Sequence, residues 1–293
     1  MKKQILVMMA VAVLLGGCAG KAAPDDATIF EKTGEETQES ADVGATGSED
    51  YTEIIKSEID DIAGSASDLS DELVKVNSLY DKYDEMRMNA EDQTSINLLS
   101  KWGTVVWKDE TLSLLDRISQ SNSTQNKEIH DEYEKWEKYV PTMAERMSKT
   151  YEDGSIYAMI YNYNEAMRYK REAYVLASAL ADLKGDVAFS FPDSTRCGYY
   201  GDYTGDSYLI ITEGMESGSY DITIHFDDAT EVHGTGVVEE GEPDSDTYLL
   251  FTSDDGGITG FVSNSTLDAS LYVKESNNPA VSIAGAYTFD FQY

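Results

Sequence analysis

The side chains best suited to chemistry are two histidines that lie close together in the sequence, His225 and His233. Apolar and polar residues alternate around them, which predicts two antiparallel strands joined by a short turn. If residues 228–230 form that turn, His225 faces His233 across the strands, with Asp227 and Glu231 beside them. Imidazole and carboxylate groups can bind a divalent metal, but two neighbouring histidines make a weak site. These four residues are therefore weak candidates for metal ligands, and no cofactor is expected.

No other arrangement of residues is typical of an active site. The chain has no Gly-x-Ser-x-Gly elbow, no phosphate-binding P-loop and no His-Glu-x-x-His zinc motif. Gly205-Asp206-Ser207 is similar to a lipase motif, but it falls in a predicted turn between strands. Acidic residues are so numerous that a pair of them carries no information about catalysis. We therefore predict no catalytic residues and no enzymatic activity.

A tyrosine-rich segment, residues 151–174, is the most distinctive candidate for a binding surface. On a helix, one broad stripe of this segment is apolar and includes Tyr163 and Tyr174, which predicts that these two tyrosines belong to the core. Charged residues at three- and four-residue spacing follow a second stripe, which predicts a solvated, ion-paired face. The members of that second stripe are Tyr157, Tyr161, Glu165, Arg168 and Glu172.

Exposed tyrosines make good contact residues because each combines a large apolar ring with a hydroxyl group. The candidate partner-binding residues are Tyr139, Tyr157, Tyr161 and Arg168. The alternative is that these tyrosines pack at the rim of a neighbouring helix.

The N-terminus has the features of an export signal. Two lysines precede a run of eleven apolar residues, which is too short to span a bilayer. Residues 15–18, Leu-Gly-Gly-Cys, resemble the bacterial lipobox, and the resemblance implies cleavage before Cys18 and attachment of lipid to its sulfur. We therefore predict a signal peptide over residues 1–17 and a lipidated Cys18 at the start of a flexible acidic linker, residues 18–50. The expected location is extracytoplasmic, anchored to a membrane at the cell surface or facing the periplasm.

Composition limits the partners. The chain has 22 basic and 55 acidic residues and a formal net charge of −33. Nucleic acids and anionic lipid surfaces require a basic surface, so they are excluded as electrostatic partners. Cationic partners are favoured, although acidity can also serve solubility alone. Beyond Cys18, Cys197 is the only cysteine, so no disulfide can form within the mature chain.

The spacing of apolar residues divides the chain after the linker into two parts. From residue 51 to 185 the period is helical and predicts an antiparallel bundle of about four helices. Gly64 is expected to interrupt the first helix, Pro141 to kink or split the third, and Gly185 to end the fourth.

From residue 186 to 293 the period changes to two, with turn residues between short apolar runs. Eight or nine strands are expected, the first of them near residues 187–191. The predicted fold class is α+β in two segregated domains, with a helical domain at 51–185 and an all-β antiparallel meander, closed as a barrel or sandwich, at 186–293.

The helical region resembles a known family. Residues 135–139, Lys-Trp-Glu-Lys-Tyr, and the tyrosine-rich helix after them resemble the C-terminal half of the LprI-type lysozyme-inhibitor family. A helix of that family with a Trp-Asp-Asp-Glu-Leu motif is similar to the segment carrying Trp107, Asp109, Glu110 and Leu112. The resemblance implies a small helical, secreted or lipid-anchored module that inhibits lysozyme. It transfers no inhibitory residue to a position of this chain.

Two functions follow as hypotheses. The first is a cell-surface lipoprotein that acts as a non-catalytic binding module for a cationic protein such as lysozyme. The alternative is an envelope-associated lipoprotein whose β-barrel holds a peptide, a glycan or a small apolar ligand.

Overall fold

The computed structural model describes most of the chain after the predicted linker. The described residues are 49–121, 126–192, 196–201, 205–226, 230–238, 248–265, 268–283 and 286–290. The predicted signal peptide, Cys18 and nearly all of the linker lie outside these residues. All described elements belong to one compact unit, Gly44–Tyr293. Within the described residues, no helix has the length and apolar character needed to cross a membrane.

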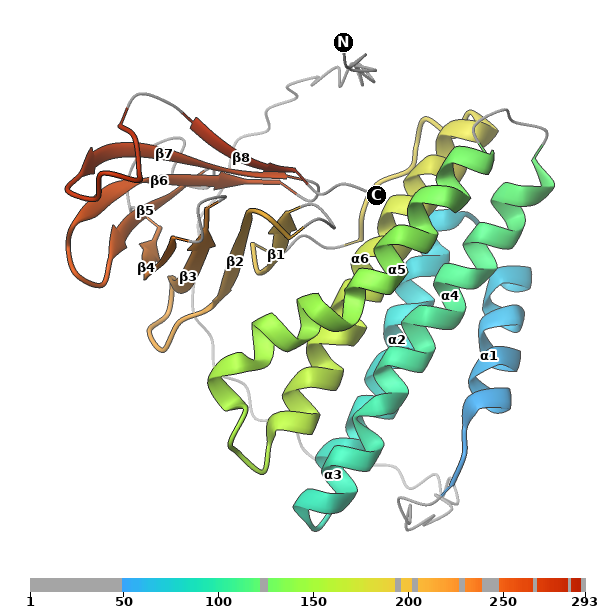
Figure 1. Cartoon of the computed structure of the whole chain (residues 1–293). Helices are drawn as coiled ribbons and strands as arrows, with labels where there is room; N and C mark the ends of the chain where they lie inside the picture. Colours follow the sequence, from blue (N-terminus) through green and yellow to red (C-terminus); the bar gives the residue numbers. More distant parts are fainter. Residues whose placement is uncertain are drawn as a thin grey trace, which may run out of the picture. The chain divides into compact units, whose positions relative to one another are not determined.

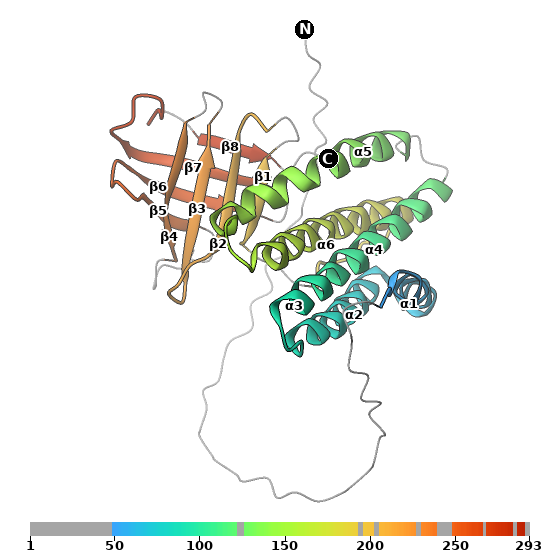
Figure 2. The same cartoon turned by 60° about the horizontal axis from the view of Figure 1, so that its bottom comes forward.

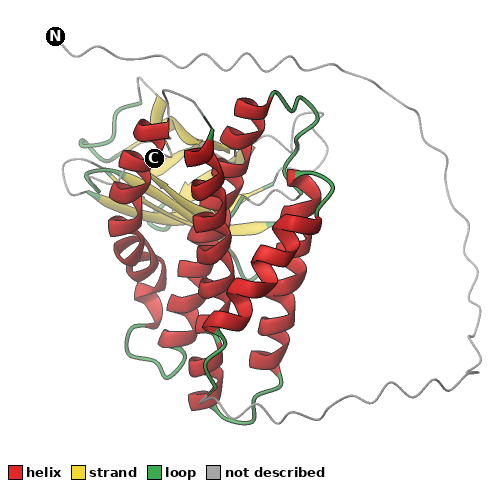
Figure 3. Cartoon of the chain, turned by 90° about the vertical axis from the view of Figure 1, so that its right-hand side faces the viewer, coloured by secondary structure: helices red, strands yellow, loops and turns green. Residues whose placement is uncertain are grey.

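The first part of this unit is helical. Its helices are α1 (Thr52–Ser65), α2 (Leu69–Met88), α3 (Gln93–Leu99), α4 (Lys101–Gln120), α5 (Asn126–Ser148), the short 3-10 helix η1 (Lys149–Tyr151) and α6 (Tyr157–Lys184). The first expected helix is interrupted after Ser65, as predicted from Gly64, and the second is divided at Ser100, which was not predicted. The described residues therefore form six α-helices rather than about four. Figure 1 shows that α4, α5 and α6 alternate in direction, and Figure 3 shows the helices packed side by side.

Local sequence accounts for the helix ends. Asp68 and Asp92 begin α2 and α3, because each carboxylate accepts a hydrogen bond from a backbone N–H of the first turn. Gly185 ends α6 in the left-handed conformation, with a φ of 70°, which glycine adopts without a steric penalty. Pro141 does not split α5, which runs through it as one helix.

Helix α6 lies at the centre of the helical part. It packs against α4 and α5 along much of its length and also contacts α2, α3 and β1. The helical core is rich in aromatic side chains, among them Trp107 and Trp136, both almost fully buried. Trp136 meets Tyr169 of α6 edge to face, with 5.3 Å between ring centroids. Because α6 has neighbours on several sides, few of its residues face solvent.

The second part is an eight-stranded antiparallel sheet. Its strands are β1 (Gly198–Gly201), β2 (Tyr208–Glu213), β3 (Ser219–His225), β4 (Glu231–Val237), β5 (Tyr248–Ser253), β6 (Ile258–Asn264), β7 (Asp268–Ser276) and β8 (Ala286–Asp290). The strand order follows the chain from β1 to β8, and β8 returns beside β1. The sheet is therefore a nearly closed barrel, as Figure 2 shows, and the predicted α+β class with segregated parts is confirmed.

Alternation along the strands fills the barrel. In β3, Ile222 and Ile224 are buried inside while Asp221 lies outside. Gly234 and Gly236 of β4 also point inward; a Cβ at Gly236 would come within 2.6 Å of the Ile222 side chain. The interior core comprises Tyr200, Leu209, Ile211, Ile222, Ile224, Phe226, Val232, Leu249, Phe251, Ile258, Val262, Ala269, Leu271, Val273, Val281 and Phe289. Apolar side chains thus occupy the space in which a barrel ligand would bind.

The prediction of a strand near residues 187–191 is wrong. This segment is a turn followed by irregular chain, and Phe189 and Phe191 pack against the helical core. Phe191 stacks on Tyr174 of α6, with 5.8 Å between ring centroids. The apolar residues that suggest a strand serve instead to bind the connecting segment to α6.

The outer face of the first two strands belongs to the helical core. Tyr199 of β1 and Tyr208 and Ile210 of β2 point away from the barrel interior and are buried in the helical cluster. Tyr200 and Leu209, their neighbours along the strands, point inward. Helices and strands therefore share an apolar junction at β1 and β2.

Candidate binding site

The exposed part of the tyrosine-rich helix is short. Tyr157 and Tyr161 are partly exposed near the start of α6 and lie side by side, with 6.1 Å between ring centroids. Desolvation raises the pKa of Tyr161, and the nearby charges of Glu165 and Glu145 raise it further. The two predicted contact tyrosines are thus brought together, and two carboxylates lie near Tyr161.

Three predictions about α6 are wrong. Tyr163, expected in the core, is 51% exposed, whereas Tyr174 is buried as predicted. Arg168 and Glu172, expected on a solvated face, are 3% and 0% exposed. Because Arg168 is buried, it cannot serve as the surface contact for a partner that was predicted. The cause is the position of α6 between other elements, since a helix covered on several sides does not follow a one-sided amphipathic pattern.

The expected ion pair between Arg168 and Glu172 does not form. Burial alone raises the pKa of Glu172 to about 8, with no charged neighbour contributing. Neither carboxylate oxygen of Glu172 has a hydrogen-bond partner among the described residues. Burial and, to a smaller extent, the charge of Arg171 lower the pKa of Arg168 to about 9, so the guanidinium is protonated at neutral pH.

Tyr139 of α5 lies at the junction with the barrel. Its hydroxyl group is 3.1 Å from that of Tyr199, and Arg146 donates hydrogen bonds to both hydroxyls, over 2.5 and 2.8 Å. The Arg146 guanidinium also stacks over the Tyr208 ring, 4.3 Å from its centroid. Tyr139 is therefore half-buried in a packed interface, and its polar group is already bonded within the chain.

The junction between the helices and the barrel also contacts the predicted histidines. Tyr208 stacks on His225, with 4.9 Å between ring centroids, and its hydroxyl donates to Glu231 over 3.1 Å. Burial raises the pKa of Tyr208 to about 12, and the charge of Glu231 contributes. Glu231 also lies 3.1 Å from Nε2 of His233. The carboxylate thus lies between the two imidazoles on the outer face of the barrel.

The predicted register of this hairpin is wrong by two residues. His225 pairs with Glu231, and Thr223 pairs with His233, whereas the prediction pairs His225 with His233. The Phe226 N–H donates a hydrogen bond to the Thr230 carbonyl, which extends the same register. Asp227 lies outside the described residues. Among the residues that are described, no group of three or more His, Cys, Asp or Glu side chains could hold a metal ion.

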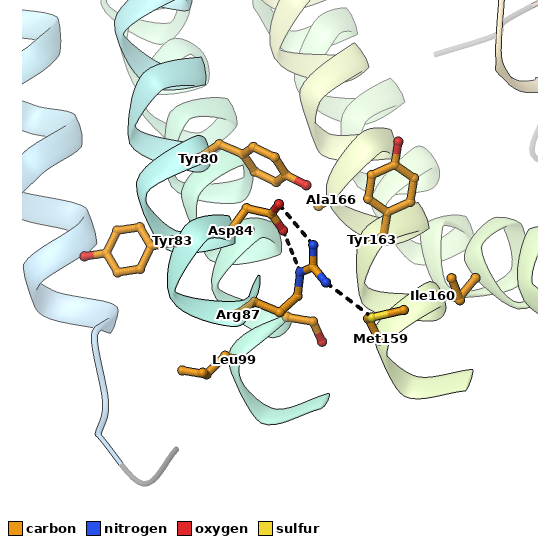
Figure 4. A pocket seen from close by; sticks show the side chains of 11 residues that line it. Tyr80, Tyr83, Asp84, Arg87, Leu99, Met159, Ile160, Tyr163 and Ala166 are labelled. Carbon is orange, nitrogen blue, oxygen red and sulfur yellow. Dashed lines mark hydrogen bonds and ion pairs between the residues drawn. The ribbon is translucent and has the colours of Figure 1, made fainter. Parts of the chain in front are cut away.

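One cavity opens between α2, α4 and α6. It has a volume of about 270 Å³ and is shown in Figure 4. Tyr80 and Tyr163 approach it from two helices, and Arg87 bridges Asp84 on its own helix and the sulfur of Met159. Gly103 allows the Tyr80 ring to pack against α4, since a Cβ there would lie 2.6 Å from a ring carbon. The Arg87 charge is paired with a carboxylate, so this cavity offers mainly apolar contacts.

A second, larger cavity lies between α6 and the strands β1 and β2. Its volume is about 450 Å³, and the residues that line it are Met147, Tyr163, Asn164, Met167, Arg168, Lys170, Arg171, Tyr174, Cys197, Gly198, Ile211, Thr212 and Glu213. Three cationic side chains and one carboxylate are among them. In a chain with 22 basic and 55 acidic residues, this local excess of positive charge is unusual.

Comparisons with protein-family models, with curated proteins and with solved structures give no match for this chain. The resemblance of the helical part to the LprI type stays a prediction from its sequence.

Arg171, Gly198 and Arg146 are not predicted as site residues from the sequence. Arg171 follows Arg168 by three residues and so shares its side of α6, which is a signal available in the sequence. The strands that these arginines meet, β1 and β2, lie far away in sequence, and no pattern indicates that they cover α6. Arg146 could not be assigned for the same reason.

Proposed function

We propose that this chain is an extracytoplasmic, lipid-anchored binding module without catalytic activity, which engages a cationic protein such as lysozyme. The observation that carries the proposal is the pair Tyr157 and Tyr161, partly exposed on α6 with the carboxylates of Glu145 and Glu165 near them. Aromatic rings beside carboxylates bind lysine and arginine side chains well, through cation–π contacts and ion pairs.

A hollow next to this pair supports the proposal. It has a volume of about 260 Å³ and is lined by Thr142, Glu145, Arg146, Lys149, Glu152 and Tyr157. The Arg146 guanidinium is bonded to Tyr139 and Tyr199, so it is held toward the junction with the barrel. Glu145, Lys149 and Glu152 are exposed, and the two carboxylates can receive a basic side chain beside the single exposed cation.

The overall charge supports the same partner. With a net charge of −33, the chain attracts basic proteins over long distances and speeds their encounter, and this attraction weakens as salt is added. The anchor at Cys18 and the linker after it would hold the module outside the membrane. Both features are proposed from the sequence.

The test is binding of lysozyme to the full chain, measured by calorimetry at low and at physiological salt, together with a lysozyme activity assay. We expect salt-sensitive binding, and about a tenfold loss of affinity in the double variant Tyr157→Ala and Tyr161→Ala. Tyr272→Ala is the control, because Tyr272 is half-exposed on the barrel, away from α6. Absence of binding at low salt, or equal loss in the control, would contradict the proposal.

A further inference from the structure

The cavity between α6 and the strands β1 and β2 contains a buried positive charge that no described carboxylate neutralises. Arg168 is 3% exposed, and its NH1 group donates to the Tyr199 carbonyl over 3.3 Å. Its Nε group has no hydrogen-bond acceptor among the described residues. The charged and phenolic groups that act on it are Arg171, Tyr200, Tyr163 and Tyr199, and no Asp or Glu side chain is among them.

An unneutralised guanidinium is costly inside a protein. Burial removes its hydration, and a protein normally compensates with an acidic partner or a full set of hydrogen bonds. Glu172 is one turn away on the same helix, but neither of its carboxylate oxygens makes a hydrogen bond to a described residue, so it does not pair with Arg168. In a chain with 55 acidic residues, the missing partner is not explained by a shortage of carboxylates.

Arg171 brings a second guanidinium to the same place. It donates to the Tyr200 hydroxyl over 3.2 Å and to the Ser265 carbonyl over 3.1 Å. Gly198 makes room for Arg171, since a Cβ at this position would clash with NH1 of Arg171, and NH1 of Arg168 lies 3.6 Å from the same point. The Arg171 charge adds to the cost of burying the Arg168 guanidinium, and an anion beside Arg168 would offset that cost.

The rest of the cavity is suited to an apolar body. Met147, Met167 and Ile211 line it, together with the Tyr174 ring. Tyr163 and Cys197 are not fully buried, so the cavity can be reached from solvent. Glu213, the carboxylate among the lining residues, is exposed at the end of β2. A volume of about 450 Å³ is within the range of pockets that hold small ligands.

We propose that this cavity binds a small amphiphilic anion, whose carboxylate or phosphate group pairs with Arg168 while its apolar body lies along Met147, Met167 and Ile211. The planar guanidinium donates two parallel hydrogen bonds to either kind of oxyanion. This site is distinct from the Tyr157 and Tyr161 surface, and the proposal does not depend on binding of a cationic protein.

The experiment uses the full chain with Cys18→Ser, so that Cys197 is its only thiol. Calorimetry measures affinity, and the rate of Cys197 alkylation reports occupancy of the cavity. The probes are decanoate, decyl phosphate, decanol and inorganic phosphate. We expect decanoate or decyl phosphate to bind and to slow alkylation at least fivefold, while decanol and inorganic phosphate bind at least tenfold more weakly. Which of the two anions binds better identifies the headgroup.

Variants locate the anion. Arg168→Met should lower the affinity for the anionic probe at least tenfold, and Lys184→Met, which removes an exposed charge from the end of the same helix, should not. Failure of both anionic probes to bind, equal affinity for decanol, or unchanged affinity in Arg168→Met would overturn the proposal. The comparison of decanoate and decyl phosphate with decanol needs no variant, so it decides the question even if Arg168→Met does not fold.

Discussion

In the helical part of the described chain, charged side chains lie inside the core, whereas the buried positions of the barrel are almost all apolar. Glu72, Glu110, Arg168, Arg171 and Glu172 are all buried and all lie on helices. The polar side chain that is buried in the barrel is Ser253, which bonds to Asp255 and to the Ile258 N–H.

Geometry explains the difference. A strand offers two environments, and in this barrel alternate residues take the inside and the outside. A helix surrounded by others has no such division, so polar residues on several of its sides become buried. The groups that can bind a ligand or respond to pH therefore lie in the helices. The barrel provides a stable apolar core that covers one side of them.

One buried helical cluster compensates its own charge. Arg117 of α4 donates to both oxygens of Glu72 on α2, and Glu110 lies 3.7 Å away. Burial raises the pKa of Glu110 well above its usual value, and the Glu72 carboxylate adds to the effect. The Arg117 guanidinium therefore neutralises the Glu72 carboxylate within this buried cluster. No described carboxylate pairs with Arg168 in this way, so its buried charge differs from that of Arg117.

The largest effect is expected from a charge placed inside the barrel. Leu271 is fully buried there, and Leu271→Glu should lower the free energy of unfolding by about 5 kcal/mol, because the carboxylate would have no partner. Urea unfolding followed by circular dichroism measures the change. Tyr272→Glu, at the next and half-exposed position, should change stability little. Similar values for the two variants would show that the barrel accepts charge as the helices do.

A second test concerns Glu172. Its pKa is about 8 in the folded chain and near 4.5 when unfolded, so the folded state holds the proton more tightly. Below pH 4.5 both states are protonated and the residue has no effect, whereas stability is lost as the pH rises toward 8 and ionisation becomes unfavourable in the core. This loss should be about 3 kcal/mol between pH 5 and 8.

Glu172→Gln should remove this part of the pH dependence and make the chain more stable at pH 8. Thermal and urea unfolding at pH 5 and pH 8 provide the measurement. Glu134→Gln, on the exposed surface of α5, is the matched control and should leave the slope unchanged. An identical pH slope in wild type and Glu172→Gln would refute the pKa assigned to Glu172.

The smallest effect is expected for Arg168 itself. Arg168→Met should raise the free energy of unfolding by about 2 kcal/mol in the absence of ligand, because an uncompensated buried charge is replaced by an apolar chain of similar length. Urea unfolding at pH 7 gives the value, with Lys184→Met as control. A loss of stability would mean that the guanidinium supports the fold, and the argument for an anion beside it would weaken.

The sequence predicts the barrel well because the alternation of apolar and polar residues along each strand identifies its inner and outer faces. Ile222 and Ile224 alternate with polar neighbours, and their inward positions follow from that alternation alone. The residue that pairs with His225 is harder to predict. A shift of one residue in the turn moves every cross-strand partner by two, and the turn residues in the sequence are compatible with either register. The residues stay on the predicted face, but their partners change.

The helices show where sequence analysis is insufficient. Gly185 ends α6 as predicted, since a local conformational preference decides it. The burial of Arg168 depends on β1 and β2, which begin 30 and 40 residues after it and cover α6 through Tyr199, Tyr208 and Ile210. No local pattern indicates that contact, so the charged stripe of α6 is indistinguishable from an ordinary solvated face.

A crystal structure of the chain with decanoate tests most directly the claim that binding chemistry lies along α6 and not inside the barrel. The carboxylate should lie about 3 Å from the Arg168 guanidinium, with the alkyl chain beside Met167. Decanoate found within the barrel core, or bound away from Arg168, would contradict that claim.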